Sequence, residues 1–142
     1  MILIDNYLDF KNFITTLEYK PTLLLHACCA PCSTHCLMVL KNYFDITIFY
    51  SNDNIYPEEE YDKRLEEIIN FCKAFDIKIK VVDDGYNHQD FLDAIKGKED
   101  LGERSERCYN CTRATAALRR PIAFTTSIVY YLRILISIVL GL

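Results

Sequence analysis

The stretch that decides the fold is "TLLLHACCAPCSTHCLMVLKNYFDITIFYSNDN", residues 22–54. Its hydrophobic pattern predicts a buried strand, a helix and a second strand that ends in a polar turn, at residues 22–27, 32–43 and 45–54. Ser33 or Thr34 is expected to cap the helix. Four of the chain's seven cysteines fall within nine residues after the first strand. The stretch therefore predicts a βαβ unit with thiols concentrated at the end of its first strand.

Strands and helices continue to alternate beyond this unit. The clearest element is the helix expected at residues 56–76, where Pro57 and three glutamates suit a helix start and apolar residues recur on one face. A further strand is expected at residues 77–85, and further helices at 88–100 and 105–120. Because strands that alternate with helices form parallel sheets, we predict an α/β fold, a three-layer Rossmann-like (HUP-like) domain with a mostly parallel sheet.

One edge of the predicted sheet collects thiols and polar side chains. In parallel α/β sheets, ligands bind outside the carboxyl ends of the strands. This rule places Cys28, Cys29 and Cys32 at the end of the first strand, with residues 51–54 and 83–86 at the ends of the next two. We therefore expect the cysteine cluster to share one crevice with those two segments.

The composition is that of an ordinary globular chain, with 142 residues of which 51% are hydrophobic and 25% charged. We assign residues 1–121 to a single α/β domain and residues 122–142 to an apolar C-terminal tail. The uninterrupted apolar runs of this tail are shorter than the ~20 residues of a membrane-spanning helix, so a membrane anchor is only the alternative interpretation. The N-terminus lacks the features of a signal peptide, and a cytoplasmic location is expected.

The cysteines are expected to bind metal or carry out redox chemistry, since structural disulfides are rare in the cytoplasm. Cys29 and Cys32 form one C-x-x-C pair, and Cys108 and Cys111 form another. This spacing lets two sulfurs face one centre, as zinc sites and iron–sulfur clusters require. A redox dithiol of the thioredoxin-like type is the competing interpretation, although dithiol exchange does not need the neighbouring Cys28.

Other candidate ligands carry weaker signals. Cys36 and Cys72 share the helical spacing of apolar neighbours and are expected to be small core residues. His26 and His35 flank the cluster and could act as ligands or support them. A histidine inside an apolar strand is more often only hydrogen-bonded, so neither histidine is assigned to a metal.

A basic segment stands out from an otherwise acidic chain. Residues 96–120 contain seven basic and four acidic residues, a net charge of +3, whereas the whole chain carries −4. The remainder therefore carries −7. Such a segment either faces phosphates or is an ordinary solvated surface, and charge alone favours the solvated surface.

Three segments of the chain resemble the QueH family of epoxyqueuosine reductases. They are "LLLHACCAPCS", "FYSNDNIYPEEEYDKR" and "ERCYNCTR", and they follow one another in the family's order between residues 23 and 113. The resemblance implies a [4Fe-4S] cluster held by Cys28, Cys29, Cys108 and Cys111. It also implies that Cys32 helps to hold an adjacent mononuclear metal ion, which would be iron.

The resemblance further implies an activity. The family is cobalamin-independent and reduces epoxyqueuosine to queuosine at the wobble position of tRNA, the last step of queuosine biosynthesis. A cluster would supply electrons singly, from an electron donor of unknown identity, and a Lewis-acidic metal beside it would favour C–O cleavage. The catalytic candidates are Cys32, Tyr61 and Asp83, with Tyr50, Tyr56 and Asp84 as alternatives for the proton relay. The candidate contacts to tRNA phosphates are Arg104, Arg107 and Arg113. The pocket wall would include Asn54, Pro57, Glu60, Tyr61 and Arg64.

The chain departs from the family pattern after Arg113. Family members continue with a longer helix, a Phe-Thr-Thr-Thr strand and a much later Tyr-Cys-Gly-Cys motif. Here only "AFTT" at residues 123–126 echoes that strand, and no late cysteine pair follows. A C-terminally truncated or frameshifted member would look like this, and it could bind a cluster without turning over. The alternatives from other classes are a zinc-stabilised non-catalytic tRNA-binding module and a thioredoxin-like dithiol oxidoreductase.

Overall fold

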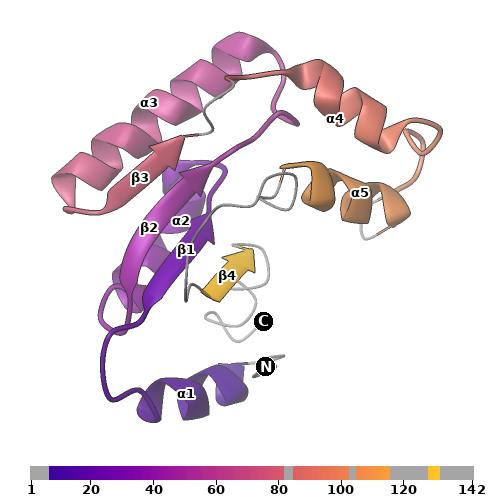
Figure 1. The fold of residues 1–142 in the computed structure, drawn as a ribbon. Helices are drawn as coiled ribbons and strands as arrows, with labels where there is room; N and C mark the ends of the chain where they lie inside the picture. The colour runs from indigo at the N-terminus through magenta and orange to yellow at the C-terminus, as the bar shows by residue number, and fades with distance from the viewer. Residues whose placement is uncertain (1–6, 82–84, 103–104, 116–127, 132–142) are drawn as a thin grey trace.

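The computed structural model describes residues 7–81, 85–102, 105–115 and 128–131 (Figure 1). In these ranges the helices are α1 (Tyr7–Thr15), α2 (Ala30–Leu40), α3 (Glu58–Ala74), α4 (His88–Ile95) and α5 (Glu106–Thr115). The strands are β1 (Thr22–His26), β2 (Asp45–Tyr50), β3 (Lys78–Val81) and β4 (Ile128–Tyr131). Among the helices of these residues, none has the length and apolar character needed to cross a membrane.

The described strands form one parallel sheet in the order β3-β2-β1-β4 (Figure 1). In the register of the sheet, Leu25 of β1 lies opposite Ile48 of β2, and Leu24 lies opposite Val129 of β4. All three pairings are parallel, so the carboxyl ends of the strands meet at one edge. The predicted α/β fold with a parallel sheet is confirmed.

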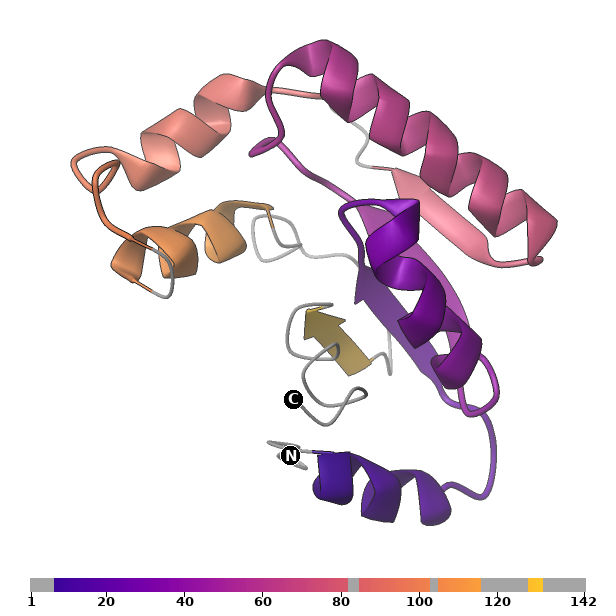
Figure 2. The ribbon, with the colours of Figure 1, turned by 180° about the vertical axis from the view of Figure 1, so that it is seen from behind.

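The core lies between the sheet and the two crossover helices. α2 lies behind the sheet in Figure 1 and in front of it in Figure 2, and it contacts α3. The buried side chains of this layer include Leu23, Leu25, Leu37, Leu40, Ile46, Ile48, Tyr50, Ile68 and Cys72. Fully burying one aliphatic side chain of this kind contributes roughly 1.5–3 kcal/mol. This shared layer fixes the strands relative to one another, and it therefore fixes the points at which the loops after them begin.

The opposite face of the sheet is also covered at its centre. Leu24 and Phe49 point to this face, because side chains alternate along a strand. They are only 1% and 5% exposed. Both faces are therefore shielded from water at the centre of the sheet.

The helix α2 begins earlier than the capping residues predict. The helix starts at Ala30, with Cys29 at its N-cap and Pro31 in its first turn. The hydroxyls of Ser33 and Thr34 do not cap it but donate to the carbonyl oxygens of Cys29 and Ala30, at 2.7 and 2.8 Å. The prediction of a Ser33 or Thr34 cap is wrong, because proline's fixed φ already suits the first turn.

Other elements differ from the predicted ones in extent. The sequence pattern gave no expectation of α1. Its Phe10 is buried, and the ring of its Phe13 stacks on that of Phe44 with the ring centroids 6.4 Å apart. α4 and α5 pack against each other beyond the carboxyl ends of the strands (Figure 1). The predicted ends of the third strand and the last helix, at residues 82–84 and 116–120, lie outside the described residues. The predicted domain boundary at residue 121 does as well.

Candidate metal centre

The loops that follow β1 and β2 are linked by buried hydrogen bonds. The side-chain amide of Asn52 donates to the carbonyl oxygen of Ala27 at 2.9 Å, and Asn52 is only 1% exposed. Burial lowers the pKa of His26, so the ring is neutral. Its Nε2 lies 2.9 Å from the carbonyl oxygen of Ser51, which can only accept, so Nε2 donates. His26 therefore supports the loop, as expected for a histidine in an apolar strand.

The segment after β3 joins the same edge. The hydroxyl of Tyr86 donates to the carbonyl oxygen of Ile55 at 2.6 Å, and Nδ1 of His88 lies 2.8 Å from the carbonyl oxygen of Asp53. The segments that follow β1, β2 and β3 are thus connected by hydrogen bonds at the carboxyl edge of the sheet, where the rule for parallel sheets places a ligand site. Asp83, the acid proposed for catalysis, lies outside the described residues.

Replacing Asn52 by alanine is expected to lower the free energy of unfolding by about 1–3 kcal/mol, because the Ala27 carbonyl would lose its partner in a buried place. Urea unfolding of the metal-free chain measures this. The matched control is Asn42→Ala, since Asn42 is exposed and its amide donates to carbonyl oxygens of its own helix end. The control is expected to change stability by no more than about 0.5 kcal/mol. Equal losses in the two variants would contradict the structural role given to Asn52.

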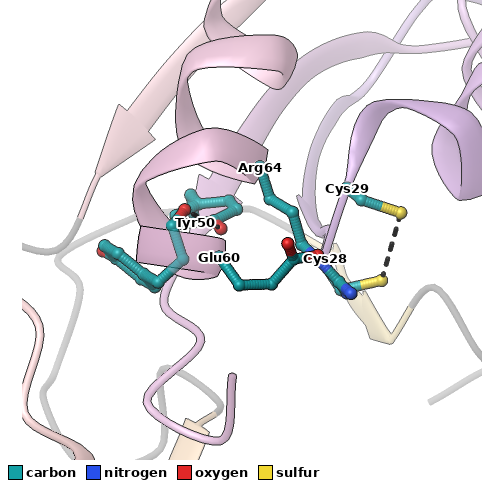
Figure 3. Close-up of polar contacts among 6 residues, drawn as sticks. Cys28, Cys29, Tyr50, Glu60 and Arg64 are labelled. Atoms are coloured by element: carbon teal, nitrogen blue, oxygen red, sulfur yellow. Dashed lines mark hydrogen bonds and ion pairs between the residues drawn. The ribbon is translucent and has the colours of Figure 1, made fainter. Parts of the chain in front are cut away.

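Three thiols gather at the start of α2. The sulfur atoms of Cys28, Cys29 and Cys32 all lie within 4.8 Å of one another, and those of Cys28 and Cys29 are 3.9 Å apart (Figure 3). Cys29 is buried, Cys28 is half-buried and Cys32 is exposed. The extended backbone of Cys29 at the N-cap and the first helical turn together bring the three side chains to one point. The group is open to solvent on the side of Cys32.

The electrostatics of the group favour a bound cation. Burial, followed by the charges of Cys29 and Cys32, raises the pKa of the Cys28 thiol to about 12. A hydrogen bond with Cys29, followed by partial burial, raises the pKa of Cys32. The raised pKa values keep these thiols protonated in the metal-free chain, so a metal ion that binds them displaces their protons, and its positive charge offsets the repulsion between the neighbouring thiolates. Thiolate ligands select zinc or iron–sulfur centres, so the donor set fits a metal of this kind.

The second cysteine pair lies on α5. Cys108 and Cys111 are three residues apart in this helix and both are half-buried. They do not join the group of three thiols that a single ion could bridge. A four-iron cluster is broader than one ion, so its ligands need not lie within the reach of one ion. The assignment of Cys108 and Cys111 to a shared cluster stays a prediction.

Tyr61, the second catalytic candidate, lies inside the core. Its side chain is 3% exposed, and its ring lies 5.2 Å from that of Tyr50 and 4.6 Å from that of Tyr86. Burial, followed by the charge of Asp53, raises the pKa of Tyr61. The raised pKa makes the phenol a weaker acid than a free tyrosine, and its role as a proton donor stays a prediction.

The candidate tRNA contacts are only partly described. The guanidinium of Arg107 donates to the carbonyl oxygen of Glu99 at 3.3 Å and so joins α5 to the preceding turn. Arg104 lies outside the described residues, and Arg113 belongs to α5, of which only the backbone is described at this position. Of these three side chains only that of Arg107 is described, and the contact of all three with phosphates stays a prediction.

The remaining cysteines and one ion pair complete the site's surroundings. Cys36 and Cys72 are 1% exposed and belong to the core, as predicted. Nε of Arg64 donates to Glu60 Oε1 at 2.7 Å, and the Arg64 side chain extends to the thiols of the β1 loop (Figure 3). The resemblance assigns both residues to the pocket wall, but the place of Arg64 beside the sulfurs could not be read from its helical spacing.

Comparison with known proteins identifies the family. The family model described as Epoxyqueuosine reductase QueH matches residues 23–130. The chain belongs to the QueH family. It is 43% identical over 90 residues to the Epoxyqueuosine reductase QueH of Haemophilus influenzae, which covers 63% of this chain and 36% of that protein. With the relative of the same name from Staphylococcus aureus it shares 38% identity over 97 residues, covering 66% of this chain and 40% of that protein.

The QueH relatives are longer than the matched segment. The Epoxyqueuosine reductase QueH of Streptococcus pyogenes is 33% identical over 96 residues, covering 65% of this chain and 38% of that protein. The chain thus spans about two fifths of the length of these relatives. The QueH family match reaches residue 130, beyond the last motif that carries the resemblance, and it includes most of β4.

Proposed function

We propose that this chain forms the metal-binding unit of an epoxyqueuosine reductase that converts epoxyqueuosine to queuosine at the wobble position of tRNA. The observation that supports the proposal most is the group of three thiols at the carboxyl edge of the sheet, in a chain of the QueH family. The relatives carry the name of this activity. The proposal places the reaction in the cytoplasm.

The proposal assigns a cofactor to the cysteines. Cys28, Cys29, Cys108 and Cys111 hold a [4Fe-4S] cluster, and Cys32 holds an adjacent iron ion. When bound, these groups supply single electrons and a Lewis acid. The overall change takes two electrons and two protons: the two C–O bonds of the epoxide break, a C=C bond forms and the oxygen leaves as water.

The chain's own side chains have distinct roles in this proposal. Cys32 is exposed and so stands where the substrate arrives. Tyr61 and Asp83 supply protons in this proposal. Arg104, Arg107 and Arg113 bind tRNA phosphates, and a separate protein or small molecule donates the electrons.

Anaerobic purification with metal analysis and visible spectroscopy tests the cofactor. The expected result is about four to five irons per chain with a broad band at roughly 400 nm. Zinc without colour would contradict the proposal and favour a zinc-stabilised module. A metal-free chain with a reducible Cys29–Cys32 disulfide would favour a dithiol enzyme.

The activity is tested with an anticodon stem-loop RNA that carries epoxyqueuosine. Chemically reduced, cluster-loaded chain is expected to remove one oxygen atom from the modified nucleoside, measured by mass spectrometry of the digested RNA. A chain that holds the cluster but leaves the nucleoside unchanged would contradict its catalytic activity without affecting the metal assignment.

A further inference from the structure

A charged pair on α3 reaches the thiols from the opposite side to α2. Figure 3 shows the Arg64 side chain extending from α3 toward Cys28. Glu60, one turn earlier on the same helix, accepts from Nε of Arg64 at 2.7 Å. The two side chains are 38% and 37% exposed, so the pair lies at the border between the protein and solvent. Glu60 thus fixes the direction in which the guanidinium points.

The guanidinium and the thiols act on one another through their charges. The hydrogen bond to Glu60 raises the pKa of Arg64, and the charges of Cys29 and Cys28 raise it further. In return, the charge of Arg64 opposes the rise in the pKa of Cys32. Arg64 is therefore close enough to the thiols for a change of charge at the sulfurs to change its electrostatic interaction with them.

We propose that Arg64, held by Glu60, is the cation that stabilises the reduced form of the metal cluster to which Cys28 and Cys29 contribute ligands. This inference rests on the proposed function, because it needs a redox-active metal at these thiols. Reduction adds one electron to the centre and breaks no bond. The electron comes from the one-electron donor that the activity requires, for which dithionite substitutes in the experiment. A fixed positive charge beside the sulfur ligands favours the added negative charge.

A purely structural role for the pair predicts something different. An exposed ion pair four residues apart on a helix contributes little to stability, and breaking it from either side has the same effect. If Arg64 instead stabilises the reduced metal centre, the effect on reduction depends on the sign of the charge that is removed. Removing the cation should disfavour reduction, whereas removing the carboxylate should not.

The experiment is a redox titration of the full chain, reconstituted anaerobically and followed by visible absorption and electron paramagnetic resonance. At the solution potential where the wild-type centre is half reduced, Arg64→Gln is expected to lower the ratio of reduced to oxidised centre about tenfold, equivalent to about 59 mV for a one-electron couple. The matched control is Lys63→Gln, which removes the same charge from an exposed neighbour on α3. The control is expected to titrate as the wild type does.

Two further variants separate charge from structure. Arg64→Lys keeps the charge and is expected to stay within about twofold of the wild-type ratio. Glu60→Gln removes the negative charge but keeps a side-chain oxygen that can accept from Arg64, so it is expected to leave the ratio unchanged or raise it. A drop with Arg64→Lys as large as with Arg64→Gln, or a drop with Glu60→Gln, would overturn the inference. Circular dichroism checks that each variant is folded.

The failure of the inference differs from that of the proposed function. A cluster that forms in the wild type but has the same potential in Arg64→Gln overturns the inference alone. A wild-type chain that takes up no redox-active metal overturns the proposed function and the inference together.

Discussion

Replacement of Cys29 by serine is expected to reduce the metal content of the anaerobically purified chain by more than about tenfold. Changing a residue that only supports a metal ligand typically costs 10–100-fold in affinity, and Cys29 is proposed as a ligand itself. Its sulfur lies 3.9 Å from that of Cys28 and is buried, so solvent cannot easily supply a replacement ligand. A serine hydroxyl at this position is not ionised at neutral pH and is a poor ligand for a thiophilic metal.

Cys72→Ala is the matched control for this loss. Cys72 is 1% exposed and lies in the core on α3, so its thiol does not take part in the group of three. The control is expected to keep the wild-type metal content per folded chain, although it loses some stability because a buried side chain is shortened. Equal metal loss in both variants would show that the effect of Cys29→Ser comes from misfolding. Metal analysis and circular dichroism on the same samples separate the two causes.

Replacement of Cys111 by serine is expected to remove the absorption of the [4Fe-4S] cluster, because this residue is proposed as the cluster's fourth protein ligand. Cys28, Cys29 and Cys32 are unchanged in this variant and are expected still to bind one Co²⁺ ion. Visible spectroscopy after anaerobic reconstitution measures the first result, and titration with Co²⁺ measures the second. Loss of the cluster absorption with retained Co²⁺ binding would indicate a cluster shared between α5 and the start of α2. Retention of both would indicate a metal site formed by Cys28, Cys29 and Cys32 alone.

Asn110→Ser is the control for the Cys111 variant, because it changes a side chain between the two cysteines of α5. It is expected to keep the wild-type iron content. Cluster absorption that survives Cys111→Ser at full strength would contradict the shared ligand set. It would leave the three thiols of the β1 loop as the whole metal site.

Much of the fold could be predicted because the apolar runs are short and regular. The runs that became β1 and β2 are buried in a parallel sheet, where strands carry continuous apolar residues, and the helix between them has the spacing of a buried face. The position of Cys28, Cys29 and Cys32 at the sheet edge followed from topology alone. The strands and the helix depend on residues close together in the sequence, and the position of the cysteines depends on the general rule that ligands bind at the carboxyl ends of parallel strands.

The features that could not be predicted depend on contacts between distant segments. Asn52 is one of several polar residues in its turn, and only the fold brings its amide to Ala27, 25 residues away. Likewise, the spacing of Glu60 and Arg64 predicts an ion pair, but not that Arg64 ends beside the thiols. The start of α2 was missed because proline in a first turn replaces a side-chain cap.

The hydrogen bonds of His26 and Asn52 bear on how the centre is assembled. They order the β1 loop through the fold itself, since both donate to backbone carbonyls of the facing loops. The conformational entropy of bringing Cys28, Cys29 and Cys32 together is therefore lost when the chain folds and not when a metal arrives. Such a chain can take up its metal after folding, because Cys28, Cys29 and Cys32 are already close together in the folded chain.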